Sequence, residues 1–421
     1  MTDVIIIGGG PSGSVLGSYL SKAGISNIIF EKAHHPRPHV GESLVPSTTR
    51  VFKEIGFLET MEKEGFVRKY GAAWHPYNRR GEFDIEFREF PQKGVDQDYT
   101  YHVDRAKFDL LLLKHAQGLG SKVYQGVHVQ EVLFEDGYAK GVRFKIGEQN
   151  VTMPCKIVVD ASGRDTLLGR QLKIKTKDPI FNQYAVHAWY ENLDRGKGRT
   201  ADYIHIYFLP VERGWVWQIP INNEITSVGV VVERDVFKKS KMDIESYFNF
   251  HVNSNEDIKT AMQSAKRIND FKTEGDYSYK MDKFCGNGFI LVGDAVRFVD
   301  PIFSSGISVA SYSAKFASEK IVEVLKTGDF SEASLKSYET KLRAGVEIWY
   351  EFIRLYYKLL HLFTFFIMSK DHRLAVLQLL QGEVYDRTEA PVLKEMRKFI
   401  EKVEKSENHL LKGHLTEMPI D

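Results

Sequence analysis

A glycine-rich turn near the N-terminus carries the first residues whose types and spacing indicate chemistry. The pattern G-x-G-x-x-G follows the apolar run 3–7 and opens a helix expected over 14–23. Its first glycine permits a tight turn, its second lets backbone amides approach a pyrophosphate, and its third lets helix and strand pack closely. The positive end of the helix then favours phosphate. An ordinary glycine-rich turn is the alternative. The predicted cofactor-binding residues are Gly8, Gly10, Pro11, Ser12 and Gly13.

An acidic residue follows at the distance that a dinucleotide site requires. The apolar strand 28–30 ends in Glu31, which lies 21 residues beyond Gly10 and is followed by Lys32. A carboxylate at this position accepts hydrogen bonds from the ribose hydroxyls. Strand, turn, helix and strand within about 30 residues form one βαβ unit. We therefore predict that Glu31 and Lys32 contact the nucleotide.

A second cofactor element lies nearly three hundred residues later. The apolar strand 289–292 ends at Gly293 and Asp294, and a long helix to about residue 326 follows Pro301. A carboxylate at a strand end can bind a ribityl hydroxyl, and a helix N-terminus can face the flavin edge that becomes negative on reduction. A plain turn is the alternative. The pair of elements favours FAD over NAD.

At this point the sequence resembles FAD-dependent oxidoreductases of the p-hydroxybenzoate hydroxylase type over nearly its whole length. The resemblance implies that Arg105 contacts the flavin side of FAD and that the backbone of Val129 contacts adenine. The family's Asp-Gly motif falls at Asp160 to Gly163, where the sequence reads Asp-Ala-Ser-Gly-Arg, a departure that argues against direct binding of NAD(P)H. Nothing suggests covalent attachment, so non-covalent FAD is expected.

Four local patterns resemble flavin-dependent halogenases more closely. Residues 214–220 contain W-x-W-x-I-P, residues 40–46 resemble the flavin-facing loop G-E-S-x-x-P, residues 69–72 give K-x-G-A, and residues 304–306 match a halide-binding turn. The residues to which the resemblance assigns roles are Lys69, Trp215, Trp217 and Glu42 in catalysis, Ser43, Gly306 and Ile307 in cofactor binding, and Ser305 and Gly306 in halide binding.

The resemblance implies a reaction in which reduced FAD, O2 and chloride or bromide give hypohalous acid for an electron-rich aromatic substrate. Two rigid tryptophans can wall off the flavin. Lys69 can hold hypohalous acid by hydrogen bonding or form a haloamine, and backbone N–H groups at a helix start can hold halide. A flavin reductase would act in trans. The alternatives to these functional roles are structural: tryptophans that pack in the core, a lysine exposed to solvent, and serines that cap the helix.

The patterns together predict an α/β fold. We expect a Rossmann-like FAD-binding domain of the glutathione reductase/p-hydroxybenzoate hydroxylase type, an inserted antiparallel β-sheet substrate domain, and a C-terminal helical region. The expected boundaries are 1–75, 100–178 and 280–330 for the discontinuous FAD-binding domain, 76–99 and 179–279 for the β-rich substrate domain, and 331–421 for the helical region.

The composition argues against several classes of protein: those that bind nucleic acid, those held together by disulfides or zinc, and those that span a membrane. The chain has 421 residues with 57 basic and 56 acidic side chains, which removes the electrostatic argument for nucleic acid. Cys155 and Cys285 are too few for a disulfide framework or a structural zinc site, so we predict no metal and a reducing, cytoplasmic location. The apolar stretch 355–368 is too short to span a bilayer. His75, in a Trp-His-Pro-Tyr run, is interpreted as structural.

The aromatic C-terminal region and two rival functions stay open. Its aromatic residues indicate packing core. The alternatives are a cover over an apolar substrate tunnel, or attachment to a membrane surface or to another subunit. Its shortness argues against a carrier-protein partner. One rival function is an FAD-dependent monooxygenase or a geranylgeranyl-reductase-like enzyme on an apolar substrate. The other is a flavoprotein without turnover. The aromatic residues are Tyr350, Phe352, Tyr356, Tyr357, Phe363, Phe365 and Phe366.

Overall fold

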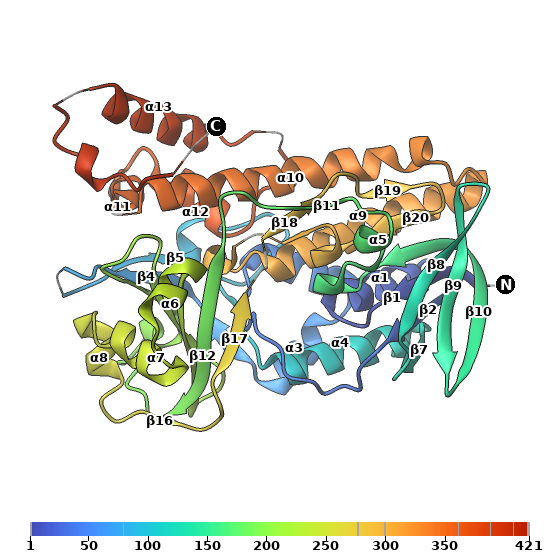
Figure 1. Ribbon diagram of the computed structural model, residues 1–421, viewed down its shortest axis with the longest axis horizontal. Helices are drawn as coiled ribbons and strands as arrows, with labels where there is room; N and C mark the ends of the chain where they lie inside the picture. The colour runs from blue at the N-terminus through green and yellow to red at the C-terminus, as the bar shows by residue number, and fades with distance from the viewer. Residues whose placement is uncertain are drawn as a thin grey trace.

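A computed structural model describes residues 2–78, 80–275, 278–298, 300–360, 362–387, 389–406 and 408–418. Figure 1 shows two sheets side by side, with a long helix running along one side of both. The predicted α/β class is confirmed, since a largely parallel sheet and a largely antiparallel sheet alternate with helices along the chain.

The first sheet is built around the N-terminal strand. Strands β1, β2, β7, β10 and β20 pair in parallel, because helices connect them on the faces of the sheet. Helix α1 packs against both α4 and α9. The bounds are β1 (Thr2–Ile7), α1 (Pro11–Lys22), β2 (Asn27–Glu31), α4 (Arg105–Leu119), β7 (Lys122–Gln125), β8 (Val129–Glu135), β9 (Tyr138–Ile146), β10 (Gln149–Asp160), β19 (Cys285–Gly286), β20 (Phe289–Leu291) and α9 (Gly306–Thr327).

The second sheet has the order β16-β12-β15-β14-β13-β4-β5, with β17 also beside β12. Its pairs are antiparallel except β13 with β4. Helices α6 and α7 contact strands β12 and β15. The bounds are β4 (Gly71–His75), β5 (Phe83–Glu86), β12 (Gln183–Glu191), β13 (Ile204–Phe208), β14 (Trp215–Pro220), β15 (Ile225–Glu233), α6 (Arg234–Ser240), α7 (Ile244–Val252), α8 (Glu256–Ala261), β16 (Lys266–Arg267) and β17 (Lys272–Gly275).

Short elements join the two sheets. Strand β3 pairs with β6, and β18 pairs with both β11 and β21. Because β4 lies in the second sheet, residues 71–75 belong structurally with the β-rich part, whereas the sequence boundaries place them in the first domain. The domain division itself stays a prediction. The bounds are α2 (Pro46–Ile55), α3 (Leu58–Glu64), β3 (Val67–Lys69), β6 (Thr100–His102), α5 (Leu167–Gln171), β11 (Lys175–Lys177), β18 (Tyr279–Met281) and β21 (Arg297–Phe298).

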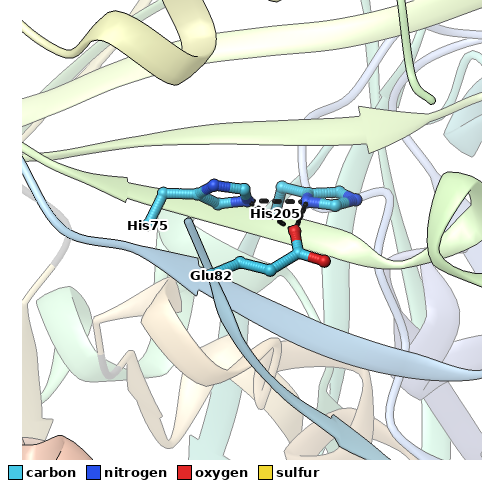
Figure 2. A group of neighbouring side chains, drawn as sticks. All are labelled: His75, Glu82 and His205. Atoms are coloured by element: carbon cyan, nitrogen blue, oxygen red, sulfur yellow. Dashed lines mark hydrogen bonds and ion pairs between the residues drawn. The ribbon is translucent and has the colours of Figure 1, made fainter. Parts of the chain in front are cut away.

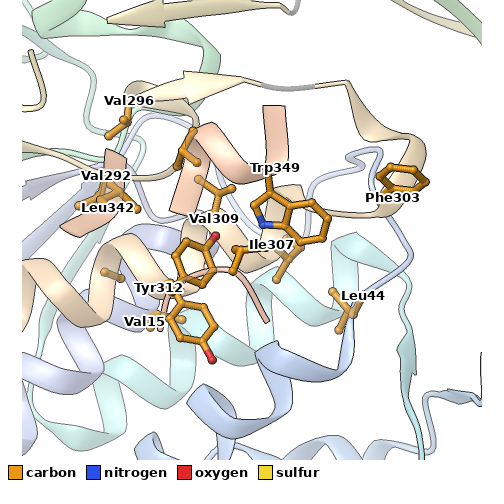
Figure 3. Packing of buried hydrophobic residues seen from close by; sticks show 14 of the residues in the cluster. Val15, Leu44, Val292, Val296, Phe303, Ile307, Val309, Tyr312, Leu342 and Trp349 are labelled. Atoms are coloured by element: carbon orange, nitrogen blue, oxygen red, sulfur yellow. The ribbon is translucent and has the colours of Figure 1, made fainter. Parts of the chain in front are cut away.

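The C-terminal region packs as core. Helix α10 (Glu332–Lys358) runs beside both sheets, followed by α11 (Phe363–Met368), α12 (Arg373–Leu380) and α13 (Pro391–Lys405). The ring of Phe303 stacks on Phe352 at 4.4 Å and meets Tyr356 edge-on at 4.8 Å. Figure 3 shows Trp349 and Phe303 within this packed cluster. Of the aromatic residues noted in this region, Phe365 is exposed and the others are buried or half-buried, so packing in the core explains most of the set.

Among the described residues, no helix has both the length and the apolar composition that crossing a membrane requires.

Candidate functional site

A cavity of about 670 Å³ is lined by residues of both sheets. This volume lies within the range of roughly 300–1,000 Å³ that small-molecule and cofactor pockets occupy. Lys69, Gly13, Asp160, Gly293 and Ser305 are predicted site residues that do not line it. The predicted residues that do line it are Gly8, Gly10, Pro11, Ser12, Glu31, Lys32, Glu42, Ser43, Arg105, Val129, Gly163, Trp215, Trp217, Asp294, Pro301, Gly306 and Ile307.

The three N-terminal glycines have different roles in this wall. Gly8 has φ +114°, and a Cβ there would lie 2.2 Å from the carbonyl oxygen of Ala161. A Cβ on Gly13 would lie 2.0 Å from the carbonyl oxygen of Gly8, so this glycine lets the helix approach the strand. A Cβ on Gly10 would meet only the Arg37 guanidinium, at 3.7 Å. Gly10 therefore keeps cavity space clear for a ligand.

Glu31 closes the same end of the cavity. Its carboxylate accepts hydrogen bonds from the backbone N–H of Gly9 at 2.7 Å and of Ala33 at 2.9 Å. The guanidinium of Arg37 lies 4.0 Å away. The carboxylate is thus held in a fixed position at the end of β2, as the sequence predicts for a ribose contact. Lys32 forms an ion pair with Asp165 at the rim of the cavity.

Two helix starts open on this cavity without caps of their own. Helix α1 begins after Gly10 and helix α9 begins after Ser305; neither has a side-chain cap or an acidic residue in its first turn. Their positive dipole ends are therefore available to an anionic ligand. The arrangement fits FAD, whose pyrophosphate would be held at α1 and whose flavin would be held at α9.

Asp294, on the turn after β20, also lines this cavity. Burial raises its pKa to about 6, although the guanidinium groups of Arg105 and Arg164 oppose the rise. A half-buried carboxyl group that lines a cavity is suited to accept a hydroxyl hydrogen bond from a polyol chain. The position of this carboxyl group, together with the two uncapped helix starts, fits FAD.

Asp160 and Gly293 support the wall from behind. The Asp160 carboxylate accepts from the N–H of Ser162 at 2.9 Å and of Leu168 at 2.7 Å, and it is fully buried. The N–H of Gly293 donates to the Ser313 hydroxyl at 2.8 Å. Both residues hold turns in place by these hydrogen bonds. In the turn after Asp160, the lining residues are 161–165, which include Gly163.

Arg105 holds the loop over residues 40–46. Its guanidinium forms a bidentate pair with Asp109, at 2.8 and 3.0 Å, and donates to the carbonyl oxygen of Val40 at 2.8 Å. The side chain is buried and reaches the cavity wall. A rigid pair of this kind fixes the path of the loop that carries Glu42 and Ser43.

Glu42 is a buried acid in this loop. Its carboxylate accepts from the indole N–H of Trp189 at 3.3 Å and from the N–H of Gly41 at 3.2 Å. Burial raises the pKa of its carboxyl group, against these hydrogen bonds. The contact with Trp189 on β12 ties the loop to the second sheet. Ser43 also lines the cavity, and its backbone forms an isolated antiparallel β-bridge with His102 on β6.

Lys69 lies behind the same loop and is not solvated. The side chain is 3% exposed and its ammonium donates to the carbonyl oxygen of Leu44 at 2.9 Å. The ring of Phe87 lies 5.5 Å from the nitrogen. Burial lowers its pKa to about 7. Lys69 is therefore a lysine whose neutral amine is well populated near pH 7, the property that reactive lysines have.

Trp215 and Trp217 point to one face of β14, as their alternation predicts. Both line the cavity, whereas Val216 packs in the separate core on the other face of the sheet. Their rings lie 6.0 Å apart, and the Trp217 indole donates to the Ser227 hydroxyl at 3.1 Å. A Cβ on Gly229 would lie 2.2 Å from the Trp217 ring, so that glycine makes room for it.

In the turn at 304–306, two residues line the cavity and one is buried. Ser304 has φ +58° and lines the cavity together with Gly306, while Ser305 is buried and faces away from the lining. Backbone N–H groups at the start of α9 are thus better placed for halide than the Ser305 side chain. Halide binding by this turn stays a prediction.

The sequence patterns do not indicate one hydrogen-bond network at the cavity wall. The Trp215 indole donates to the hydroxyl of Tyr357 at 2.8 Å, and that hydroxyl donates to the carboxylate of Asp300 at 2.9 Å. Asp300 also accepts from the N–H of Ile302 at 3.0 Å, at the start of the turn that precedes α9. The Asp300-Pro301 pair is a helix-start signal in the sequence. The partner Tyr357 lies 57 residues away on α10, and only the fold reveals it.

A model of the tryptophan halogenase family matches residues 3–93 and 83–361. The chain belongs to this family of flavin-dependent halogenases. It is 48% identical to the 1H-pyrrole-2-carbonyl-[peptidyl-carrier protein] chlorinase of Pseudomonas fluorescens, over 99% of this chain and 97% of that enzyme. It is 30% identical to the corresponding brominase of Pseudoalteromonas luteoviolacea, over 91% of this chain and 92% of that enzyme.

Solved structures agree with the membership. The flavin-dependent brominase Bmp2 superposes with a TM-score of 0.88 at 28% identity, covering 96% of this chain and 99% of that structure. An FAD-dependent oxidoreductase of the halogenase type, with FAD and halide as cofactor and co-substrate, is thereby confirmed. The monooxygenase, reductase and non-catalytic alternatives are not favoured. The full-length match to a carrier-protein chlorinase also removes the argument that a short C-terminal region excludes a carrier protein.

Proposed function

We propose that this halogenase acts on an electron-rich heteroaromatic acyl group of the pyrrole-2-carbonyl type, held as a thioester on a peptidyl carrier protein. The observation that supports the substrate is the 48% identity, over nearly the full length of both chains, to a chlorinase with this substrate. The brominase relative has the same substrate class, so the halide is chloride or bromide. A separate flavin reductase supplies reduced FAD, and the enzyme works in the cytoplasm.

The proposed roles of the site residues follow from their geometry. When bound, reduced FAD and O2 supply the oxidising equivalent that turns halide into hypohalous acid. Trp215 and Trp217 form a rigid wall on the cavity side of β14 and keep the aromatic substrate away from the flavin. N–H groups at Gly306 hold halide. Glu42 and Arg105 keep the loop over residues 40–46 in place.

Lys69 carries the proposed chemical step. Its buried amine, with a pKa near 7, attacks the halogen of hypohalous acid, so that an N–halogen bond forms, the O–halogen bond breaks and water leaves. The resulting haloamine, or a hydrogen-bonded hypohalous acid in the same place, presents the electrophile to the ring. Because Lys69 lies behind residues 42–44 rather than in the cavity, the electrophile and the flavin are on opposite sides of this loop.

The experiment compares carrier-bound and free substrates with purified enzyme, FAD, a flavin reductase and NADPH. Pyrrole-2-carbonyl loaded on a carrier protein, free pyrrole-2-carboxylate and a simple phenol are each incubated with chloride or bromide, and products are measured by mass spectrometry. Halogenation confined to the carrier-bound acyl group supports the proposal. Equal or faster halogenation of the free phenol contradicts the carrier-bound assignment.

Two lysine variants test the role of Lys69 in the same assay. Lys69→Ala is expected to abolish product while FAD binding is retained. Lys63→Ala, which removes an exposed lysine of α3, is the matched control and is expected to react as the unaltered enzyme does. Product formation by Lys69→Ala at the normal rate would reject the role.

A further inference from the structure

Two histidines meet ring to ring in the second sheet, on a side of the fold that the cofactor cavity does not use. His75 ends β4 and His205 lies on the neighbouring strand β13. Their ring nitrogens, Nε2 of His75 and Nδ1 of His205, are 2.9 Å apart, and the two residues are 7% and 5% exposed. Neither histidine lines the cofactor cavity. A close pair of buried imidazoles outside the cofactor site therefore needs its own explanation.

The outward nitrogens fix which atoms carry protons. Nδ1 of His75 lies 3.1 Å from the carboxylate of Asp257, and Nε2 of His205 lies 2.8 Å from the carbonyl oxygen of Thr200. Both partners are acceptors, so both outward nitrogens carry hydrogen. A neutral imidazole has only one N–H. The two inward nitrogens therefore face each other with lone pairs, an arrangement that is repulsive unless a positive species lies between them.

A third acceptor lies near the two inward nitrogens. The Glu82 carboxylate, in the turn between β4 and β5, lies 3.3 Å from Nε2 of His75 and 3.8 Å from Nδ1 of His205. Figure 2 shows the three side chains converging. A single shared proton can satisfy two of these acceptors but not all three. Three converging acceptors instead match the ligand set of a cation.

The dimensions and chemistry agree with zinc. Imidazole nitrogen and carboxylate oxygen bind zinc at about 2.0–2.1 Å in tetrahedral geometry, which places neighbouring ligand atoms about 3.3 Å apart. The three distances here, 2.9, 3.3 and 3.8 Å, scatter around this value. Each outward N–H bonds to a carboxylate or a carbonyl, which is the usual second contact of a metal-bound histidine. Asp257 and Thr200 thus already orient both rings for metal binding.

We propose that His75, Glu82 and His205 bind one divalent transition-metal ion, zinc by preference, with a water as the fourth ligand. Glu82 is partly exposed and gives the ion a route from solvent. The ring of Tyr207 stacks on His75 at 4.2 Å and keeps that ligand in place. The ion joins β4, the turn before β5, and β13.

The proposed ion has a structural consequence for catalysis. Strand β4 starts two residues after Lys69, and His75 is its last residue. A metal at the far end of β4 therefore fixes the strand that leads away from Lys69. We assign the ion this positioning role and no part in the halogenation chemistry.

The test uses full-length protein that has been dialysed against a chelator. Zinc is titrated by calorimetry, and cobalt is added in a parallel sample to give the visible absorption bands of a tetrahedral N/O site. One ion per chain, a dissociation constant in the micromolar range or tighter, and a rise in melting temperature on adding zinc are expected, since binding to the folded state alone stabilises it.

Three variants separate this site from adventitious binding. His205→Ala is expected to weaken zinc binding at least 100-fold, and Glu82→Gln, at a partly exposed position that is safe for folding, at least 10-fold. His251→Gln changes another buried histidine of the same region and is expected to bind zinc normally. Absence of binding at 100 µM zinc, or unchanged affinity in both His205→Ala and Glu82→Gln, would overturn the proposal in favour of a shared proton.

Discussion

The indole nitrogen of Trp215 donates to the hydroxyl of Tyr357 across 2.8 Å, which joins the cavity wall to helix α10. The same hydroxyl donates to Asp300 beside the start of α9. A family signature on β14, a C-terminal helix and the expected flavin edge are therefore connected by two buried hydrogen bonds.

Removing this contact is expected to lower stability. Trp215→Phe loses one buried hydrogen bond and should cost about 1–2 kcal/mol. Tyr357→Phe loses this bond, the bond to Asp300 and a longer one from the Gln183 amide, and should cost more. Urea unfolding of the two single variants and the double variant gives the coupling energy. A value below about 0.5 kcal/mol would show that the two side chains do not act as a unit.

Asp300 is expected to make stability fall with rising pH. Burial raises its pKa to about 7, so the folded state keeps a proton that the unfolded state loses near pH 4. Its stabilisation is complete below about pH 4 and is lost as the pH rises through 7.

The matched variant is Asp300→Asn, which keeps the acceptor oxygen and removes the titration. Its free energy of unfolding, relative to the unaltered enzyme, should rise by roughly 2–4 kcal/mol between pH 4 and pH 7. Parallel stability curves for the two proteins would contradict the raised pKa.

Lys69 is expected to limit stability at neutral pH. Its pKa falls from an ordinary 10.5 to about 7, so the unfolded state binds the extra proton between these values and stability rises with pH across that window. Lys69→Met should therefore gain on the order of 2–4 kcal/mol at pH 7 and under ~1 kcal/mol at pH 10. Lys63→Met, at an exposed position, should show no such dependence; equal gains at both pH values would reject the explanation.

The same pKa predicts the pH profile of the reaction. If the neutral amine of Lys69 carries the halogen, kcat/KM should rise about tenfold from pH 6 to pH 7.5 and then level off. The reaction is followed by product mass with reductase in excess, so that supply of reduced FAD does not limit the rate. A fall in kcat/KM above pH 7 would assign the charged ammonium instead.

Two neighbouring glycines should separate cofactor binding from folding. Gly10→Ala adds a Cβ that meets the end of the Arg37 side chain. The backbone of Gly10 is extended, with φ −73°, so alanine fits there without strain. The variant should therefore fold normally and bind FAD at least 10-fold more weakly. Gly13→Ala adds a Cβ 2.0 Å from a backbone oxygen and should cost over ~2 kcal/mol of stability. Fluorescence titration with FAD and thermal melts measure the two effects. Normal FAD affinity in Gly10→Ala would exclude the pyrophosphate from this turn.

Local sequence patterns are sufficient to predict the local elements of this protein. The glycine spacing at 8–13, the acid at the end of β2 and the alternation of Trp215 and Trp217 depend on strand and helix periodicity, which neighbouring residues set. For the same reason, the long helix after Pro301 ends at residue 327, close to the expected end near residue 326. The α/β class follows from the order of these elements.

Contacts between residues far apart in the sequence depend on how the folded elements pack. Tyr357 joins Trp215, and Leu44 meets Lys69, because packing of separate elements brings them together, and no local pattern encodes such a contact. Burial likewise decided that Lys69 has a pKa near 7 instead of being a solvated lysine. His75 and His205, 130 residues apart, received no metal role from the sequence, because their convergence with Glu82 depends on the pairing of β4 with β13.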